Sequence, residues 1–335
     1  MEQLFTDARI ERWLKSGILL AVSGGADSVA LLRFFVEMKK NVAPSSSIAV
    51  AHVNHGLRAA ESDEDAAFVE KLAARHHLRF YATKITPEKW KADNTGSFEA
   101  AARNLRYEFL VSAAQSGGFR HIALAHTKND QAETILHRII RGTGIAGLSG
   151  IPAVRKINDA VSLVRPFLCI EKKEILDYLQ SRQQDFRHDS SNDTMNWTRN
   201  RIRLNILPTI RKSINPSVDE SLLRLGKQAA ELHSVIDEML DSIYDEIVTQ
   251  SASDMVIIRY APLGNLPEYI ARELMLRIWK TQNWSLRHIG FEHWRHVAAM
   301  LREAAGSVKS VSLPGGITAR IDAESKTMTI VKGVS

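Results

Sequence analysis

The stretch Ile18-Leu-Leu-Ala-Val-Ser-Gly-Gly-Ala-Asp-Ser28 decides the fold of this 335-residue chain. Its apolar run Ile18–Val22 predicts a strand, and the Val-Ala-Leu-Leu that follows Ser28 begins a helical pattern. Between them, Gly24 and Gly25 can adopt positive φ and bring several backbone N–H groups close to an anion. The start of the helix adds unpaired N–H groups and the positive end of a dipole. The stretch therefore predicts a strand–loop–helix unit that holds phosphate.

Strand-like and helix-like segments alternate along the first part of the chain. Four further apolar runs predict strands, at Ile48–Val53, Phe80–Ile85, Ile122–Ala125 and Val161–Val164. Helical patterns lie between them, at Asp63–Arg75, Ser97–Ala114 and Asp130–Arg141. This alternation predicts an α/β fold with a doubly wound, mostly parallel sheet. Ligands of such sheets lie beyond the carboxyl ends of the strands, which is where the glycine loop stands.

The pattern changes near residue 210. Pro208 and Pro216 bracket a stretch that is rich in turn residues, and Ser221–Gln250 predicts one long helix. Short strand candidates follow at Met255–Arg259, Lys309–Leu313, Thr318–Ile321 and Met328–Val331. We therefore expect a larger domain over residues 1–212 and a smaller α+β region, helical and then β, over residues 213–335.

Composition places the chain among globular proteins of a reducing compartment. Apolar residues make up 44% and charged residues 24%, close to the averages for folded domains. The first residues lack the apolar core of a signal peptide, and no run approaches the ~18–20 apolar residues of a membrane span. The single cysteine, Cys169, excludes an intrachain disulfide. We expect a cytoplasmic protein with no membrane partner, and the net charge of +6 permits a nucleic-acid partner without requiring one.

Histidine and acidic side chains follow the predicted strand at 122–125. His126, Asp130 and Glu133 are spaced to gather at the start of a helix, which suits Mg²⁺ or an amine substrate. The residues also allow a structural interpretation, because Thr127 with Asp130 is a Thr-x-x-Asp helix start, a near relative of the capping box. Both interpretations can hold together.

Arginines recur at helical spacing in two places. Arg103, Arg106 and Tyr107 share one helix face, and two guanidiniums on one face suit a polyphosphate. The alternative there is a surface ion pair of Glu99 with Arg103.

The second place is the segment Arg199-Asn-Arg-Ile-Arg203, in which Arg199 and Arg203 share a face. A charged face of this kind is usually solvated, and at the edge of a catalytic domain it also fits contact with RNA phosphates. Farther along, three tryptophans fit either stacking on bases or a small apolar core: Trp279, Trp284 and Trp294.

The glycine loop resembles the Ser-Gly-Gly-x-Asp-Ser pyrophosphate loop of the PP-loop ATPases. It lacks the lysine of a Walker A motif, and its residues alone would also fit an ordinary turn with a helix cap. The resemblance implies that the loop holds the pyrophosphate end of ATP while the α-phosphate is attacked, with Mg²⁺ at Asp27. The residues that it assigns to ATP are Ser23, Gly24, Gly25, Ala26, Asp27 and Ser28.

Further segments, in the same order, resemble those of the tRNA(Ile)-lysidine synthetases, a branch of the PP-loop ATPases. They are Ala51-His-Val-Asn-His-Gly-Leu-Arg58, Glu99-Ala-Ala-Ala-Arg-Asn-Leu-Arg-Tyr107, Leu124-Ala-His-Thr-Lys-Asn-Asp-Gln-Ala-Glu-Thr134, the glycine-rich Arg138–Ile151, and Asp189–Pro208. The family usually has a second histidine where this chain has Thr127. The single cysteine also excludes the PP-loop thiolases, which need several thiolates.

The resemblance implies a ligase that joins L-lysine to C2 of the wobble cytidine of a tRNA(Ile) with a CAU anticodon. ATP and Mg²⁺ would be its cofactors, and an adenylylated tRNA its intermediate. The residues implicated in catalysis are Asp27, Arg103, Arg106, His126, Asp130 and Glu133, with Asp130 and Glu133 holding lysine. The ATP site would also include His52, Asn54, Gly142, Thr143 and Gly144, and the tRNA site Arg199, Arg201 and Arg203.

Three points stay open at the level of sequence. The C-terminal region around Leu313 resembles the part of the family that helps to hold tRNA. The oligomeric state is not determined, and a homodimer is one option. The rival functions are a PP-loop ligase for a small molecule and a non-enzymatic protein that binds ATP or RNA.

Overall fold

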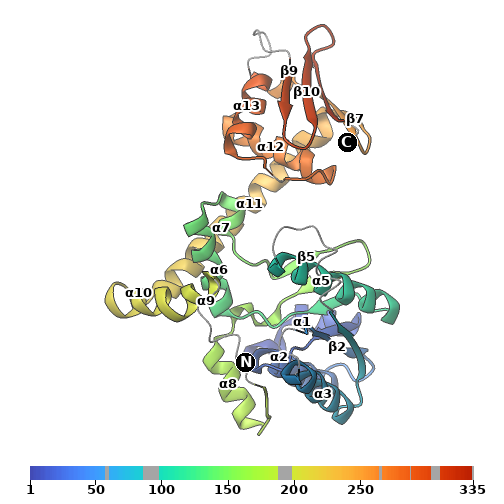
Figure 1. Ribbon diagram of the computed structural model, residues 1–335, viewed down its shortest axis with the longest axis vertical. Coiled ribbons are helices and arrows are strands. Elements are labelled where there is room, and N and C mark those ends of the chain that lie inside the picture. The colour runs from blue at the N-terminus through green and yellow to red at the C-terminus, as the bar shows by residue number, and fades with distance from the viewer. Residues whose placement is uncertain are drawn as a thin grey trace. The chain divides into compact units, whose positions relative to one another are not determined.

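The computed structural model describes residues 1–56, 60–85, 98–187, 198–263, 266–286, 288–302 and 310–333 (Figure 1). The chain divides into two compact units, Met1–Ala229 and Ala230–Ser335. This division lies within the long helix α11 (Val218–Ile247), and the domain boundary expected after residue 212 stays a prediction. Among the described residues, no helix is both long and apolar enough to cross a bilayer.

The first unit is built on a six-stranded sheet with the strand order β3-β2-β1-β4-β6-β5. Its parallel strands are β1 (Ile18–Ala21), β2 (Ile48–Asn54), β3 (Arg79–Lys84), β4 (His121–Ala123) and β6 (Ser162–Val164). The edge strand β5 (Val154–Lys156) is antiparallel to β6. The mostly parallel α/β sheet expected from the sequence is confirmed.

Helices surround this sheet and follow its strands. They are α1 (Ala8–Lys15), α2 (Ala26–Asn41), α3 (Ala60–Arg75), α5 (Phe98–Gly117), α6 (Lys128–Arg141), α7 (Ile145–Leu148), α8 (Lys172–Ser181), α9 (Thr198–Arg201) and α10 (Leu207–Ser213). Short helical turns are η1 (Glu2–Thr6), η2 (Pro166–Cys169) and the π-helical turn η4 (Ile202–Ile206). The order of strands and helices is that of crossover units, in which each helix returns the chain to the next parallel strand.

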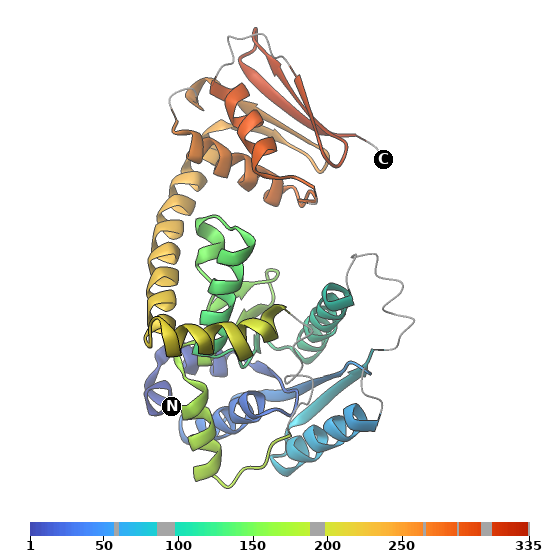
Figure 2. The ribbon, with the colours of Figure 1, turned by 60° about the vertical axis from the view of Figure 1, so that its left-hand side comes forward.

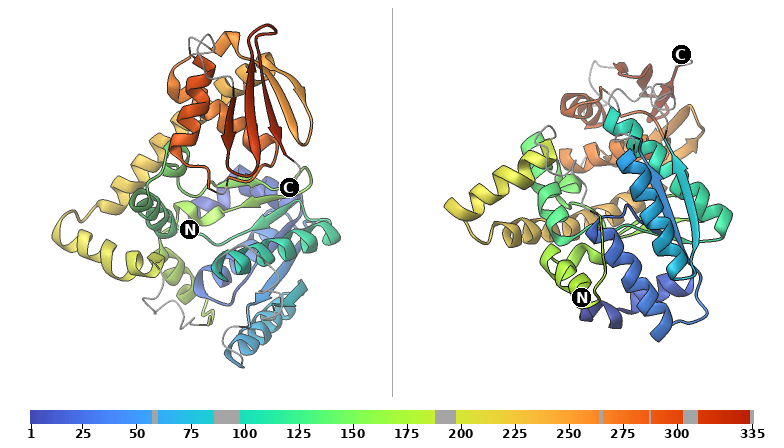
Figure 3. Two further views of the ribbon diagram at one scale, coloured as in Figure 1. Left: turned by 45° about the horizontal axis from the view of Figure 1, so that its top comes forward. Right: turned by 60° about the horizontal axis from the view of Figure 1, so that its bottom comes forward.

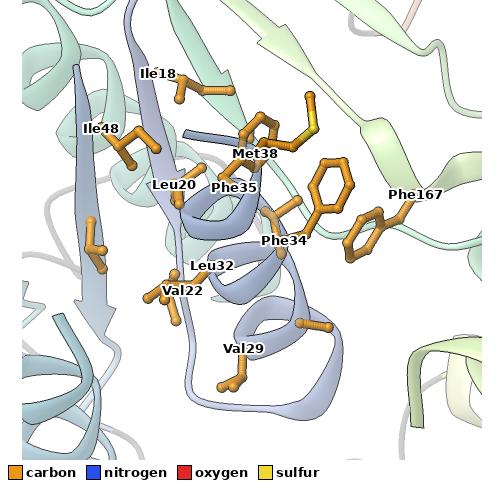
Figure 4. Close-up of a cluster of buried hydrophobic side chains, with 14 of the residues drawn as sticks. Ile18, Leu20, Val22, Val29, Leu32, Phe34, Phe35, Met38, Ile48 and Phe167 are labelled. Carbon is orange, nitrogen blue, oxygen red and sulfur yellow. The ribbon is translucent and has the colours of Figure 1, made fainter. Parts of the chain in front are cut away.

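Alternation along each strand produces two cores, one on each face of the sheet (Figure 2). On β1, Ile18 and Leu20 pack with α2, whereas Leu19 belongs to the core that α5 covers. Figure 4 shows Phe34 of α2 beside Phe167, and their rings meet edge-on with centroids 5.8 Å apart. Each such fully buried side chain contributes on the order of 1.5–3 kcal/mol. Burial on both faces explains why β1 reads as a continuous apolar run.

The strand order creates a switch point beside β1. The chain proceeds from β1 outward to β2 and β3, then returns to the other side of β1 as β4. The loops that follow β1 and β4 therefore diverge to opposite faces, and ligands of such sheets bind in the crevice between them. Ser23–Ser28 follows β1 and His126 follows β4, so the sheet brings these two predicted site segments to the same crevice.

The second unit holds a five-stranded antiparallel sheet of order β7-β8-β11-β10-β9 (Figure 3). Its strands are β7 (Val248–Ser251), β8 (Met255–Arg259), β9 (Ser310–Leu313), β10 (Ile317–Asp322) and β11 (Thr327–Lys332), and its helices are α12 (Glu268–Thr281) and α13 (Phe291–Arg302) with the turn η5 (Ala261–Leu263). Alternate residues of β10 are buried, so one face of this sheet forms a core. The tryptophans belong to a core as well. Trp279 is fully buried and meets Trp284 and Trp294 edge-on, with ring centroids 5.0 and 5.1 Å apart.

Two local expectations were wrong. The stretch around Pro208 is helical rather than turn-rich, because proline at the first turn of a helix has no N–H to lose and its φ is already suitable. The long helix ends at Ile247, and the next residues form the edge strand β7, whose pairing with β8 overrides local helical preference.

Candidate active site

The loop after β1 is closed by its own two serines. Ser28 Oγ donates to the carbonyl of Gly25 at 2.9 Å and accepts the N–H of Ser23 at 3.1 Å. Gly24 has φ of +101°, a conformation that side chains with Cβ rarely adopt. Gly25 is the cap of α2, whose first N–H groups have no partner within the helix. The loop thus has the conformation of an anion cradle, and its contact with phosphate stays a prediction.

Arg187, which the sequence reasoning missed, fixes this loop from outside. Its backbone N–H donates to the carbonyl of Gly24 at 2.9 Å. Its guanidinium is bound by two carboxylates of α3, with Glu64 Oε2 at 2.8 Å and Asp65 Oδ1 at 3.0 Å. The loop is therefore tied to α3 through a residue that lies far away in sequence, and no local pattern marks Arg187 for this task.

Asp27 carries a buried carboxylate oxygen without a partner. Its Oδ1 receives no hydrogen bond, and its Oδ2 lies 3.7 Å from Nζ of Lys172. Burial raises the pKa of Asp27 and the charge of Asp130 raises it further, while Lys172 and Arg203 oppose the rise. An orphaned carboxylate oxygen beside an anion cradle fits Mg²⁺. The described residues contain no group of three metal-ligating side chains, so phosphate oxygens and water would supply the other ligands.

His52 and Asn54 lie on β2 and bind the chain itself. His52 is buried, and its Nδ1–H donates to the carbonyl of Val22 at 2.8 Å, which supports the strand end just before the loop. Burial lowers the pKa of His52, so the ring is neutral. The amide of Asn54 donates to Asp63 at 2.7 Å and accepts the N–H of Gly56 at 2.8 Å. This geometry gives no support to an ATP contact by the Asn54 amide, and Arg58 lies outside the described residues.

The acidic pair and the arginines of the later segment form one ion-pair network. Arg203 donates to Glu133 Oε1 at 2.6 Å and to Asp130 Oδ1 at 3.2 Å. Arg199 donates to Asp130 Oδ1 at 2.9 Å and to Glu133 Oε2 at 3.2 Å. The candidate lysine-binding acids are thus brought together with two of the candidate tRNA-binding arginines. Arg201 is exposed.

Asp130 also caps its own helix. Thr127 and Asp130 form a reciprocal capping box at the start of α6, so the structural interpretation of these residues holds alongside the functional one. Burial alone would raise the pKa of Asp130, but Arg199, the hydrogen bonds from Thr127 and the His126 charge lower it overall. The carboxylate is therefore charged at neutral pH.

A cavity of about 120 Å³ joins these groups. It is lined by Asp27, Thr127, Asn129, Asp130, Glu133, Lys172, Arg203, Leu207 and Arg211. Four of these, Asn129, Lys172, Leu207 and Arg211, escaped the sequence reasoning, because nothing in their local pattern separates them from ordinary helix residues. Lys172 is placed by its backbone N–H, which donates to Asn129 Oδ1 at 3.0 Å.

His126 is close enough to Asp130 and to Arg106 of α5 for both charges to act on its ring. Burial, with the neighbouring arginine charges, lowers the pKa of His126 to about 3, although Asp130 opposes the shift. The ring is neutral, and its Nδ1 is buried without a partner. Arg106 is largely enclosed, whereas Arg103 is exposed and both lie against the ring of Tyr107.

Gly142, Thr143 and Gly144 lie at the far end of α6. Gly142 ends the helix with φ of +75°, as the sequence predicts for a residue after a helix. Twelve residues separate it from Asp130, which corresponds to roughly 18 Å along a helix axis. Arg138 holds the segment by donating to the carbonyls of Gly147 and Gly150 at 2.8 and 2.7 Å. The ATP contact expected of residues 142–144 stays a prediction that this geometry does not support.

Comparison with known proteins agrees with this geometry. The PP-loop domain family matches residues 2–210. The chain belongs to the PP-loop family. Among solved structures, the U34-tRNA thiolase NcsA from Methanococcus maripaludis shares the PP-loop protein's fold, with a TM-score of 0.54 at 17% identity over 69% of this chain and 78% of that chain.

Curated relatives of this PP-loop protein are named tRNA(Ile)-lysidine synthase, the family whose motifs its sequence resembles. A tRNA(Ile)-lysidine synthase from Solibacter usitatus is 35% identical over 298 residues, which are 89% of this chain and 64% of that protein. One from Dehalococcoides mccartyi is 33% identical over 311 residues, 92% of this chain and 65% of that protein. The chain therefore spans just under two thirds of the length of these relatives.

Proposed function

We propose that this PP-loop protein uses ATP to join L-lysine to C2 of the wobble cytidine of tRNA(Ile) with a CAU anticodon, giving lysidine, AMP and pyrophosphate. One observation carries the proposal. Asp27 of the phosphate loop lines the same cavity as the carboxylates of Asp130 and Glu133, so a nucleotide site adjoins an amine site. The relatives named tRNA(Ile)-lysidine synthase support tRNA(Ile) as one substrate, and lysine as the other is part of the proposal.

The first step would form a good leaving group on the base. The C2 oxygen of cytidine attacks the α-phosphorus of ATP, the bond to the β-phosphate breaks, and pyrophosphate leaves. The N–H groups of the Ser23–Ser28 loop and the dipole of α2 stabilise the departing negative charge. Mg²⁺, held by Asp27 and phosphate oxygens, would neutralise further charge, and Lys172 lies within reach of the same carboxylate.

The second step would exchange AMP for lysine. The neutral ε-amine attacks C2, the bond to the AMP oxygen breaks, and one amine proton is released. Asp130 and Glu133 would position the amine. The charges of these two carboxylates are already neutralised by Arg199 and Arg203. A lysine that bound as the protonated ammonium would therefore add an unpaired positive charge, unless one of the arginines turned toward a phosphate of a substrate.

The proposal is tested by incubating the chain with ATP, radiolabelled lysine and tRNA(Ile) transcripts. We expect label to enter the transcript with a CAU anticodon and not a matched transcript with another anticodon. An Asp27→Asn variant is the inactive control. Lysine incorporation that ignored the anticodon would refute the specificity, and pyrophosphate release that needed no tRNA would favour a ligase for small molecules.

A further inference from the structure

Several guanidiniums surround one tyrosine ring on the α5 side of the sheet. The Cζ atoms of Arg103, Arg106 and Arg155 lie 5.2, 5.3 and 5.1 Å from the ring centroid of Tyr107. The positive charge of Arg165, which follows β6, also lowers the pKa of the Tyr107 hydroxyl. We call these four arginines the Tyr107 arginine cluster. They come from helix α5, edge strand β5 and the end of β6, so the fold rather than one sequence motif assembles them.

The cluster has buried donors without partners. Arg165 is only 4% exposed, and while one of its terminal N–H groups donates to the carbonyl of Pro152 at 2.7 Å, its buried Nε has no hydrogen bond. The buried Nε of Arg106 also has none. Among the side chains that the structure describes, no ion pair joins any of the four to a carboxylate, and the Glu99 side chain, the alternative partner expected for Arg103, lies outside them. This contrasts with Arg199 and Arg203, which are fully paired a short distance away.

Gathered cations without described counter-ions would be stabilised by a bound anion. Like charges at close range disfavour one another, and buried guanidinium N–H groups lose their water without replacement. Burial lowers the pKa of both Arg106 and Arg165, which is the physical sign of this cost. Arginine forks suit phosphate oxygens in particular, because they offer paired donors in a plane.

The diphosphate of ATP is not the anion that this position suits. The charges that act on Asp27 of the phosphate loop are Lys172, Asp130 and Arg203, and none belongs to the Tyr107 arginine cluster. Two members of the cluster, Arg165 and Arg106, act instead on His126, and both of their charges lower its pKa. The cavity that Asp27 lines includes none of the four arginines, and Tyr107 packs against the core that α5 covers rather than the core of α2.

We infer that the Tyr107 arginine cluster binds a backbone phosphate of the RNA substrate, separately from the ATP site. The inference rests on the proposed function, because it assumes that the second substrate is RNA. Arg155 lies exposed on an edge strand and would meet the phosphate from outside, while Arg165 and Arg106 supply the enclosed donors. Holding the backbone there would place a base that has left its stack against His126 and the phosphate loop.

The test uses Arg155→Gln in the full chain, since an exposed edge-strand residue can be replaced without disturbing the core. Arg79→Gln is the matched control, because Arg79 is also exposed and lies 4.8 Å over the ring of Tyr81 on β3. Dissociation constants for a tRNA(Ile) transcript are measured by filter binding across a series of salt concentrations. Those for ATP are measured by equilibrium dialysis without RNA.

We expect Arg155→Gln to weaken tRNA binding by about tenfold and to reduce the magnitude of the salt slope by about 0.7–0.9. ATP binding should be unchanged, and Arg79→Gln should change neither. Weaker ATP binding with unchanged tRNA binding would assign the cluster to the nucleotide and overturn the inference, as would no effect on either. Because binding is measured without lysine, a chain that binds tRNA through Arg155 but never ligates lysine would refute the proposed function alone.

Discussion

Replacing Asp27 by asparagine should make the protein more stable and inactive at once. The carboxylate is largely buried, one oxygen has no partner, and the ion-pair partner of the other oxygen, Lys172, is half exposed at 3.7 Å, while the charge of Arg203 adds a further favourable contribution. An unsatisfied buried polar atom costs about 1–3 kcal/mol, and a partly exposed ion pair returns only about 0–1 kcal/mol. Removing the charge should therefore stabilise the free protein by about 1 kcal/mol, or roughly 2–4 °C in Tm.

The effect should depend on pH with a definite sign. The pKa of Asp27 is raised on folding, so between the unfolded and folded pKa values the folded state holds a proton that the unfolded state has released. Below the unfolded pKa both states are protonated and Asp27 costs no stability. The cost of burying its charge grows as the pH rises through the folded pKa. The advantage of the asparagine variant should be largest at neutral pH and should vanish in acid.

Thermal unfolding of both proteins at several pH values, without nucleotide, measures the difference. Asp219→Asn serves as the control, since Asp219 accepts two hydrogen bonds from Arg211, one of them at 2.9 Å, and its loss should lower Tm. If Asp27→Asn lowered Tm as the control does, Asp27 would be satisfied in the folded protein and its role as an open metal and phosphate ligand would lose its physical basis. Pyrophosphate release should fall to background in the same variant.

Three further outcomes follow from the contacts of the site. Arg187→Ala should raise KM for ATP several-fold with little change in kcat, because the Gly24 loop loses its tie to α3. Arg182→Ala, which breaks a partly exposed ion pair with Glu37 of α2, should leave steady-state kinetics unchanged. Glu133→Gln should lower unfolding free energy by about 1–3 kcal/mol in urea titrations, since it removes the buried carboxylate that pairs with the partly exposed Arg199 and Arg203. His126→Gln should flatten the pH dependence of stability: with a folded pKa of about 3, the wild type loses stability as pH falls below about 6.5, where only the unfolded chain takes up the proton. A pH dependence identical to that of the wild type would refute the buried neutral histidine.

Local sequence patterns were sufficient to predict the main strands and the glycine loop of this protein. Ile18–Val22 and Ser23–Ser28 carry their structure in their own residues, through apolar continuity, paired glycines and a helix start. The strand predicted at Met255–Arg259 has the observed bounds of β8, because its burial alternates with a period of two. Such signals act over a few residues, which is the range that a sequence pattern reports.

Contacts between residues that are far apart in the sequence could not be predicted in this way. Arg187 reaches Gly24 only because the chain after α8 returns to α3, and Lys172 meets Asp27 only because α8 starts beside α6. The glycines at 142–150 illustrate the opposite error. Their pattern correctly predicts a helix end, yet it contains no information about which end of α6 faces the nucleotide. Spacing in sequence identifies turn chemistry, and only the packed fold assigns that chemistry to a ligand.

The strand order explains how one edge of a sheet could bind two anionic groups and an amine on the proposed function. β1 leads into backbone N–H groups, which on the proposed function would hold the diphosphate, and β4 leads into carboxylates, which would hold the amine. Beyond β4 the order continues to β6 and β5, which contribute Arg165 and Arg155. The acids of α6 are neutralised by Arg199 and Arg203, so they add little to the negative charge that two polyanions would bring to neighbouring positions. A second cationic site suits a second polyanionic substrate such as RNA, whereas a ligase for a small neutral substrate would gain nothing from it.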